Sequence, residues 1–206
     1  TGVFSLDEMA GMMELAGPDV PIPVDASDIV CENGTDIWVG GASGVYHCNA
    51  ADGIFTEITC EGSPIVGVSS LFEDSEGYLW IAACEHGLYR YDIKTGAMVF
   101  YSQGSLYYAN TVFKDISGRL WIGTWGKGLL RISDPYSHGE LEYACYTHGS
   151  DPSSLMDDVV YDINEDLSGR LWIASRSGLS ILSDPQQGTS FENYAPGQTD
   201  SGIPYN

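Results

Sequence analysis

The side chains of this chain that are best suited to hold a ligand are aromatic and polar residues in short, glycine-rich segments. Trp125 lies in Thr124-Trp125-Gly126-Lys127-Gly128, and the corresponding segments elsewhere contain Glu85-His86 and Arg176. Flat rings stack on the apolar face of a sugar, while charged and amide groups hydrogen-bond its hydroxyls. The candidate ligand-binding residues are Glu85, His86, Tyr107, Asn110, Trp125, Lys127, Asp158, Tyr161 and Arg176.

Acidic residues in recurring turns suggest acid–base catalysis or calcium binding, but their spacing favours a structural role. Asp74, Asp115 and Asp166 are each followed three residues later by glycine, which is typical of turns in which the carboxylate caps backbone amides. This spacing does not match a twelve-residue calcium loop. The histidines share no metal-ligand spacing, and no serine or cysteine lies in a nucleophile motif. We therefore predict no catalytic residue, no metal site and no cofactor.

The elements that position these residues follow from a phrase that recurs along the chain. Its copies are Gly77-Tyr78-Leu79-Trp80-Ile81, Gly118-Arg119-Leu120-Trp121-Ile122, Gly169-Arg170-Leu171-Trp172-Ile173 and the looser Gly34-Thr35-Asp36-Ile37-Trp38-Val39. A period of about 40 residues, rich in aromatic, β-branched and glycine residues, is typical of a β-propeller. We expect the four repeated tryptophans to pack between neighbouring blades, because tryptophan buries a large area in such layers.

Residues 66–102 illustrate one repeat. Strands are expected over 66–74, 78–83, 87–91 and 98–101, separated by turn-forming residues. Four short antiparallel strands of this kind make one propeller blade. The loop between the second and third strands, and the connection into the next blade, line the ligand-entry face of a propeller. This arrangement is expected to bring the candidate residues to one rim.

The repeats also predict the domain organisation. Blades are expected at approximately 27–60, 66–102, 108–146 and 159–194, and residues 1–16 resemble the outer half of another blade. A propeller closes its ring so that no sheet edge is exposed, and four blades with a half blade do not form a closed ring by themselves. We therefore predict an all-β fold. It is a β-propeller arc of about four complete four-stranded blades plus a half blade, forming a single segment over residues 1–206 of a larger propeller.

The chain is strongly acidic. It has 206 residues, a formal net charge of −21 and only eight lysines and arginines, all at or beyond Arg90. Nucleic acid and anionic lipid headgroups are bound through clustered lysine and arginine, so neither is an expected partner. No stretch approaches the apolar length needed to span a bilayer, and we expect no membrane insertion by this segment.

The five cysteines occupy different positions within their repeats and form no Cys-x-x-Cys pair. This spacing predicts neither a zinc site nor a disulfide framework. We expect most of them to be small buried hydrophobic residues. They are Cys31, Cys48, Cys60, Cys84 and Cys145.

The repeat phrase resembles the two-component regulator propeller repeat. The resemblance is carried by Phe72-Glu73-Asp74-Ser75-Glu76-Gly77-Tyr78-Leu79-Trp80-Ile81, by the following residues 87–92, and by residues 164–174. It implies a seven-bladed propeller in the periplasmic sensor region of a hybrid two-component histidine kinase from Bacteroidetes, a class that detects glycan fragments. The implied partners are an oligosaccharide ligand and the remainder of the parent propeller and kinase. A shortened first acidic turn and an expansion between Ser133 and Asp158 depart from the repeat.

Three functions stay open at the level of sequence. The favoured one is a sensor segment that binds an oligosaccharide without transforming it. A second is a propeller enzyme such as a polysaccharide or streptogramin-type lyase, which needs histidine and carboxylate side chains gathered at the channel mouth, and only Glu85 and His86 meet that description. A third is a protein-binding scaffold, in which the expanded 133–158 loop contacts a partner or open blade edges pair in a homodimer.

Overall fold

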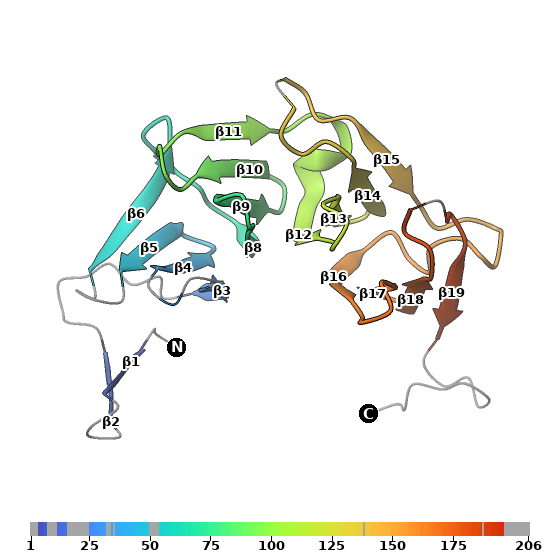
Figure 1. The fold of residues 1–206 in the computed structure, drawn as a ribbon, viewed down its shortest axis with the longest axis horizontal. Helices are drawn as coiled ribbons and strands as arrows, with labels where there is room; N and C mark the ends of the chain where they lie inside the picture. Colours follow the sequence, from blue (N-terminus) through green and yellow to red (C-terminus); the bar gives the residue numbers. More distant parts are fainter. Residues whose placement is uncertain are drawn as a thin grey trace. The chain divides into compact units, whose positions relative to one another are not determined.

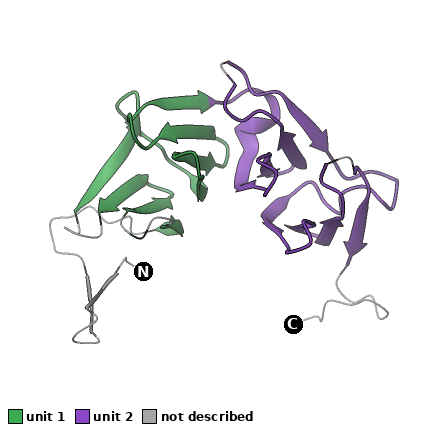
Figure 2. Ribbon diagram, in the orientation of Figure 1, with its two compact units in different colours: residues 1–100 green, residues 101–206 purple. Residues whose placement is uncertain are grey.

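The computed structural model describes residues 4–7, 12–15, 25–31, 34, 36–49, 54–137, 139–186 and 188–195. These residues form antiparallel β-sheets and one short 3₁₀ helix, η1 (Gly104–Tyr108) (Figure 1). The chain divides into two compact units, residues 1–100 and 101–206 (Figure 2). The all-β fold predicted from the repeats is confirmed, with each large sheet built as a propeller blade.

Unit 1 contains two large sheets whose strands pair in sequence order. The first comprises β3 (Ala26–Val30), β4 (Asp36–Gly41), β5 (Val45–Asn49), β6 (Phe55–Cys60) and the two-residue β7 (Ser63–Pro64). The second comprises β8 (Val68–Glu73), β9 (Tyr78–Ala83), β10 (Gly87–Asp92) and β11 (Met98–Tyr101), whose last residue falls in unit 2. β7 makes the first sheet five-stranded, where the repeat predicts four strands. β1 (Phe4–Asp7) and β2 (Met12–Leu15) form a separate two-stranded sheet within the segment expected to be a half blade.

Unit 2 contains two four-stranded sheets, again with neighbouring strands consecutive in sequence. The first comprises β12 (Ala109–Lys114), β13 (Leu120–Thr124), β14 (Leu129–Ile132) and β15 (Tyr143–Tyr146). The second comprises β16 (Val160–Glu165), β17 (Leu171–Ser175), β18 (Gly178–Leu182) and β19 (Phe191–Tyr194). The first strands of the two sheets, β12 and β16, contact each other, as β3 and β8 do in unit 1.

The acidic turn before the second strand of a blade is fixed by one carboxylate. Asp115 accepts hydrogen bonds at Oδ1 from the backbone amides of Ser117 (2.9 Å) and Arg119 (3.0 Å). Its Oδ2 accepts from Arg119 Nε (2.8 Å) and Trp121 Nε1 (2.7 Å). The predicted capping role is therefore confirmed. The same carboxylate also holds the tryptophan of the following strand.

The other two acidic turns repeat this arrangement. Trp80 Nε1 donates to Asp74 Oδ2 and Trp172 Nε1 donates to Asp166 Oδ2, each at 2.9 Å. The hydrogen bond from Trp172, together with bonds from Arg170, lowers the pKa of Asp166 well below its usual range. Trp172 is half-buried, and its ring faces the Arg170 guanidinium at 5.5 Å. The recurring Asp-x-x-Gly phrase therefore encodes a turn and a tryptophan anchor together.

Two of the repeated tryptophans lie in apolar clusters that join adjacent sheets of the same unit. Trp38 belongs to a cluster with Val68 of the next sheet, and Trp121 to one with Val160. Trp38 and Trp121 are 2% and 0% exposed. Trp38 Nε1 donates to Glu73 Oε2 of the neighbouring sheet at 3.1 Å rather than to an aspartate of its own turn. The predicted packing between blades is confirmed at these two positions.

A β-bulge lies near the start of the first strand in each large sheet. The register of these strands with their neighbours shifts at Ser27, Ser69, Asn110 and Tyr161. A bulge redirects a side chain and increases the local twist. The Ser27 hydroxyl donates to Val68 O of the next sheet, and Asn110 Nδ2 donates to Val160 O at 2.9 Å. At these two positions the redirected side chain therefore links adjacent blades.

The expectation that most cysteines are buried is wrong. Only Cys48 is buried among the five, while Cys31 and Cys145 are exposed and the other two are partly exposed. Cys145 lies on the outermost strand β15, and Cys84 lies in the β9–β10 loop. A residue on an edge strand or in a loop has few neighbours to cover it, so hydrophobic character alone does not bury it. Partial burial raises the pKa of the Cys84 thiol, and the adjacent Glu85 carboxylate raises it further.

Candidate functional site

The β13–β14 loop is closed by its own hydrogen bonds and displays two candidate side chains. Thr124 Oγ1 donates to Gly128 O at 2.7 Å and accepts the Lys127 amide at 2.9 Å. Gly126 and Gly128 have φ of +91° and +78°, a conformation that glycine adopts without a steric penalty. Trp125 and Lys127 are both exposed on this tight loop. The two glycines that flank Lys127 in the sequence therefore serve backbone geometry.

Backbone hydrogen bonds hold this loop between two other segments of unit 2. The Trp125 amide donates to Tyr108 O at 2.9 Å. Asp158 O accepts the amides of Gly126 (3.0 Å) and Gly128 (2.9 Å), and Trp125 also forms a β-bridge with Val159. The loop is thus tied to the end of η1 on one side and to the entry into β16 on the other.

Four aromatic side chains lie along this edge of unit 2, and we call them the aromatic strip. The rings of Tyr107 and Tyr108 meet edge to face at 5.1 Å, and those of Trp125 and Tyr161 lie 5.9 Å apart. Tyr107, Trp125 and Tyr161 are 40%, 48% and 46% exposed, which is unusual for rings of this size. Lys127 Nζ lies 5.0 Å from the centre of the Tyr108 ring. Predicted site residues from three separate segments are therefore neighbours in the structure.

Arg176 joins the same edge from the β17–β18 loop. Its amide donates to Val159 O at 3.0 Å, and its Nε lies 3.3 Å from Asp157 Oδ2. Asp157 also accepts the Ser177 hydroxyl and the Val159 amide. Burial raises the pKa of Asp157, but these hydrogen bonds and Arg176 outweigh that effect, so its pKa is lowered. Asp157 is thus a buried support for Arg176.

Asp157 was missed in the sequence analysis, which selected its neighbour Asp158. The only sequence signal is the acidic pair that precedes a predicted inner strand. The Asp158 carboxylate accepts the His148 amide at 2.6 Å, so it fixes the preceding loop. The Asn110 amide is likewise engaged with Val160 O. Both residues lie where the sequence places them, but each has a structural contact there.

Glu85 and His86 lie in the β9–β10 loop of unit 1 and are exposed. Glu85 has φ of +60°, a left-handed conformation that few non-glycine residues adopt. His86 Nδ1 lies 2.9 Å from Cys84 O, which fixes the ring against its own loop. Their participation in one site with the unit 2 residues stays a prediction.

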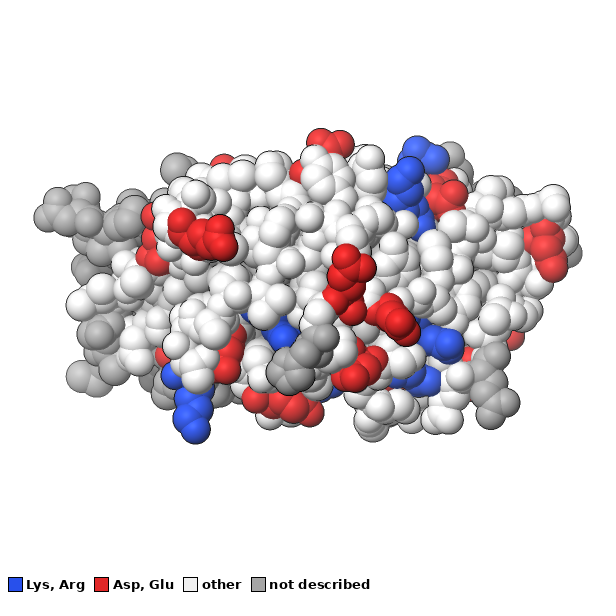
Figure 3. All heavy atoms as spheres, turned by 90° about the horizontal axis from the view of Figure 1, so that it is seen from above, with Lys and Arg blue, Asp and Glu red and all other residues white. Residues whose placement is uncertain are grey.

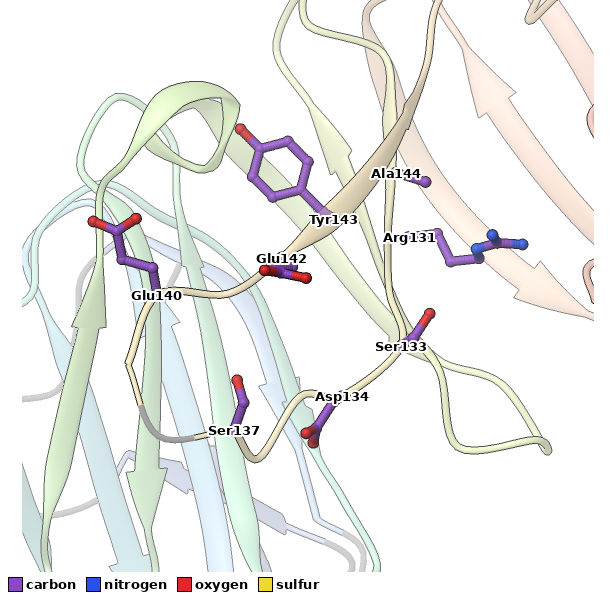
Figure 4. Close-up of a pocket in the computed structure, with 8 residues that line it drawn as sticks. All are labelled: Arg131, Ser133, Asp134, Ser137, Glu140, Glu142, Tyr143 and Ala144. Atoms are coloured by element: carbon purple, nitrogen blue, oxygen red, sulfur yellow. The ribbon is translucent and has the colours of Figure 1, made fainter.

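A separate pocket of about 540 Å³ lies on the outer strands of the β12–β15 sheet, beside the expanded loop that follows β14 (Figure 4). It is lined by Arg131, Ser133, Asp134, Ser137, Glu140, Glu142, Tyr143 and Ala144. Figure 4 shows Asp134, Glu140 and Glu142 pointing in different directions. A metal ion or an acid–base pair requires carboxylates that converge on one point, and these three do not.

The described residues form no metal cluster, and charges of both signs are mixed on the face drawn in Figure 3. Among the described residues, no group of three or more His, Cys, Asp or Glu side chains could hold a metal ion. On the face drawn in Figure 3, acidic and basic side chains are interspersed across wide uncharged areas. Within the described part of the chain, no helix has the length and apolar character that crossing a membrane requires.

Comparison with known protein families gives a match to one short segment of the chain. The model of the Two component regulator propeller family matches residues 62–84. This segment includes β8, the acidic turn at Asp74 and β9, which the sequence analysis used for the same resemblance. Among curated proteins no match was found.

Solved structures similar to the chain include extracellular domains of hybrid two component systems. One is assigned to the hybrid two component system BT3049 from B. thetaiotaomicron (TM-score 0.69, 21% identity, 95% of this chain and 26% of that one). Another is assigned to the hybrid two component system BT4673 of the same organism (TM-score 0.72, 21% identity, 88% and 24%). The chain therefore spans about a quarter of the length of these domains.

Some similar propellers at lower sequence identity are enzymes by name. Virginiamycin B lyase from Staphylococcus aureus matches with a TM-score of 0.68 and 15% identity, over 95% of this chain and 63% of that one. The structural similarity shows a shared β-propeller fold. It does not carry an activity from one protein to the other.

Proposed function

We propose that this chain is a segment of the periplasmic sensor region of a hybrid two-component system, where it binds an oligosaccharide without transforming it. The observation that carries the proposal is the aromatic strip. Three of its four rings are exposed although their size favours burial, and the β13–β14 loop that carries Trp125 is held by hydrogen bonds on both sides. A rigid, exposed set of rings is a platform on which the apolar faces of sugar rings can stack.

The polar groups beside the strip complete this kind of site. Lys127 and Arg176 supply donors for sugar oxygens, and tyrosine hydroxyls can donate or accept. The carboxylates of the pocket in Figure 4 do not converge on one point, and no group of three or more His, Cys, Asp or Glu among the described residues could hold a metal ion. The similarity to extracellular domains of hybrid two component systems favours an extracytoplasmic location.

The direct test is a thermal-shift screen of the chain against neutral and acidic oligosaccharides, with product analysis of every hit. A ligand that binds only the folded state raises the melting temperature. We expect at least one sugar to stabilise the chain and to be recovered intact. Recovery of a cleaved sugar would instead identify a lyase or glycosidase, and no stabilisation by any sugar would favour a protein-binding scaffold.

Trp125→Ala tests the location of the site. Loss of one stacked ring removes about 1–2 kcal/mol of apolar contact, which weakens binding by about 5- to 30-fold. The matched control is Phe100→Ala in unit 1, because Phe100 is 46% exposed and Trp125 is 48% exposed. Binding is measured by isothermal titration calorimetry. Equal affinity of the Trp125 variant and the wild type would show that the aromatic strip is not the sugar site.

A further inference from the structure

The basic side chains of this acidic chain fall into two groups. Most contact neighbouring groups within their own unit: Arg119 and Arg170 pair with the acidic-turn aspartates, Arg131 donates to Pro185 O of the next blade, Lys114 donates to the Tyr136 hydroxyl, and Arg90 faces Tyr78 and Trp80. Lys94 lies in an exposed turn of unit 1. The remaining two, Lys127 and Arg176, both lie beside the aromatic strip.

These two cations are brought to the same place by adjacent carbonyl groups. Asp158 O accepts the amides on either side of Lys127, and Val159 O accepts the Arg176 amide. The β13–β14 and β17–β18 loops are therefore both bound to the two residues that precede β16. Two separate blades of unit 2 thus each place one cation at the same edge.

Lys127 has no acidic partner among the described residues, and Arg176 stays largely exposed although it pairs with Asp157. Among the described residues, no carboxylate lies within ion-pair distance of Lys127 Nζ, whose contact is with the face of the Tyr108 ring. The Arg176 side chain is 65% exposed and meets Asp157 through Nε alone. Since Asp157 also accepts bonds from Ser177 and Val159, it orients the guanidinium while its Nη groups point to no described acceptor.

We propose that the aromatic strip selects an acidic oligosaccharide, whose carboxylate or sulfate groups bind Lys127 and Arg176. This inference rests on the proposed function. A chain with a net charge of −21 repels a polyanion at long range, but salt screens that repulsion beyond about 8 Å. Direct contacts are screened much less, and guanidinium and ammonium groups form strong, charge-assisted bonds with carboxylate and sulfate oxygens. A neutral sugar needs no such cations beside its stacking platform.

The test compares charged and neutral versions of the same sugars by isothermal titration calorimetry with the full chain. One pair is tetragalacturonate and its carboxyl-reduced form, and the other is a sulfated carrageenan tetrasaccharide and its desulfated form. The two pairs distinguish a carboxylate from a sulfate ligand. The variants are Lys127→Gln and Arg176→Gln, and the control is Lys94→Gln, which removes the same charge from an exposed turn.

We expect at least one charged probe to bind about tenfold or more tightly than its neutral form, since a bond to a charged group is worth about 1.5–3 kcal/mol. Lys127→Gln and Arg176→Gln should each lower the affinity for the charged probe by about tenfold and leave the affinity for the neutral probe unchanged. Lys94→Gln should change neither affinity. Equal binding of charged and neutral probes, weakened for both by Trp125→Ala, would overturn this inference while the sugar site stands. No binding of any of the four probes would overturn the proposed function with it.

Discussion

Replacing Asp115 by alanine removes four hydrogen bonds from one carboxylate, two to backbone amides and one each to Arg119 Nε and Trp121 Nε1. The Asp115 side chain is fully buried, and Trp121 is 0% exposed. In the variant, water cannot easily reach the Trp121 ring nitrogen. The Arg119 side chain, 14% exposed, keeps its charge and its second acceptor, Pro185 O.

The expected loss of stability follows from these contacts. An unsatisfied buried donor costs about 1–3 kcal/mol, and breaking a buried ion pair by removing one partner costs about 3–5 kcal/mol. Because Arg119 retains one acceptor and some solvent, we expect the free energy of unfolding to fall by about 3–4 kcal/mol. With an m-value of about 2 kcal/mol/M, the urea midpoint falls by about 1.5–2 M.

Asp166→Ala is the matched comparison, because Asp166 makes the same four kinds of hydrogen bond in the next blade of unit 2. There the aspartate and arginine side chains are 24% and 42% exposed, so water can replace the lost partner. Both variants are unfolded in urea and followed by tryptophan fluorescence. A midpoint shift for Asp115→Ala no larger than that for Asp166→Ala would refute the argument that burial makes this carboxylate costly to lose.

Two further predictions concern the edge of unit 2 that carries the aromatic strip. Gly128→Ala should destabilise the chain more than Gly126→Ala, because an added Cβ overlaps Tyr146 O at position 128 and meets nothing within 4 Å at position 126. The Gly126 variant should cost only the left-handed backbone term of about 1–2 kcal/mol, and equal urea midpoints for the two would contradict this. Asp157→Asn should lower stability at pH 6 but not at pH 2. Because the pKa of Asp157 is lowered in the folded state, its ionised form stabilises the fold above the unfolded pKa of about 3.9, and this stabilisation is lost as the pH falls. The same difference in urea midpoint between wild type and variant at both pH values would contradict this prediction.

The candidate site could be predicted only in part. Trp125 stands out in the sequence because the other repeats have no equivalent tryptophan, and Tyr107, Lys127 and Tyr161 fall at positions where propeller loops converge. Their contacts require partners 19 to 36 residues away, as between Tyr108 and Lys127 or between Trp125 and Tyr161. No local pattern encodes such pairings. Asp157 could not be told from its acidic neighbour for the same reason.

The blades themselves were determined by the sequence. Each repeat carries its own strand pattern and turn, and in three of the four an aspartate and a tryptophan six residues apart hold the two together, as in Asp115 and Trp121. These interactions are local, so a single copy of the phrase contains both partners. Recurrence of the phrase then predicts stacked sheets with buried second strands, because no blade buries both of its faces alone.

Tertiary structure decided which side chains form hydrogen bonds between neighbouring segments and which stay exposed and available to a ligand. Asn110 is redirected by a bulge to Val160 O, and Asp158 accepts the His148 amide, whereas Lys127 and Arg176 are left exposed beside the strip. Cys145 resembles a buried residue in sequence but lies on an exposed edge strand. In each case the outcome depends on the neighbouring blade, whose distance and orientation no single repeat encodes.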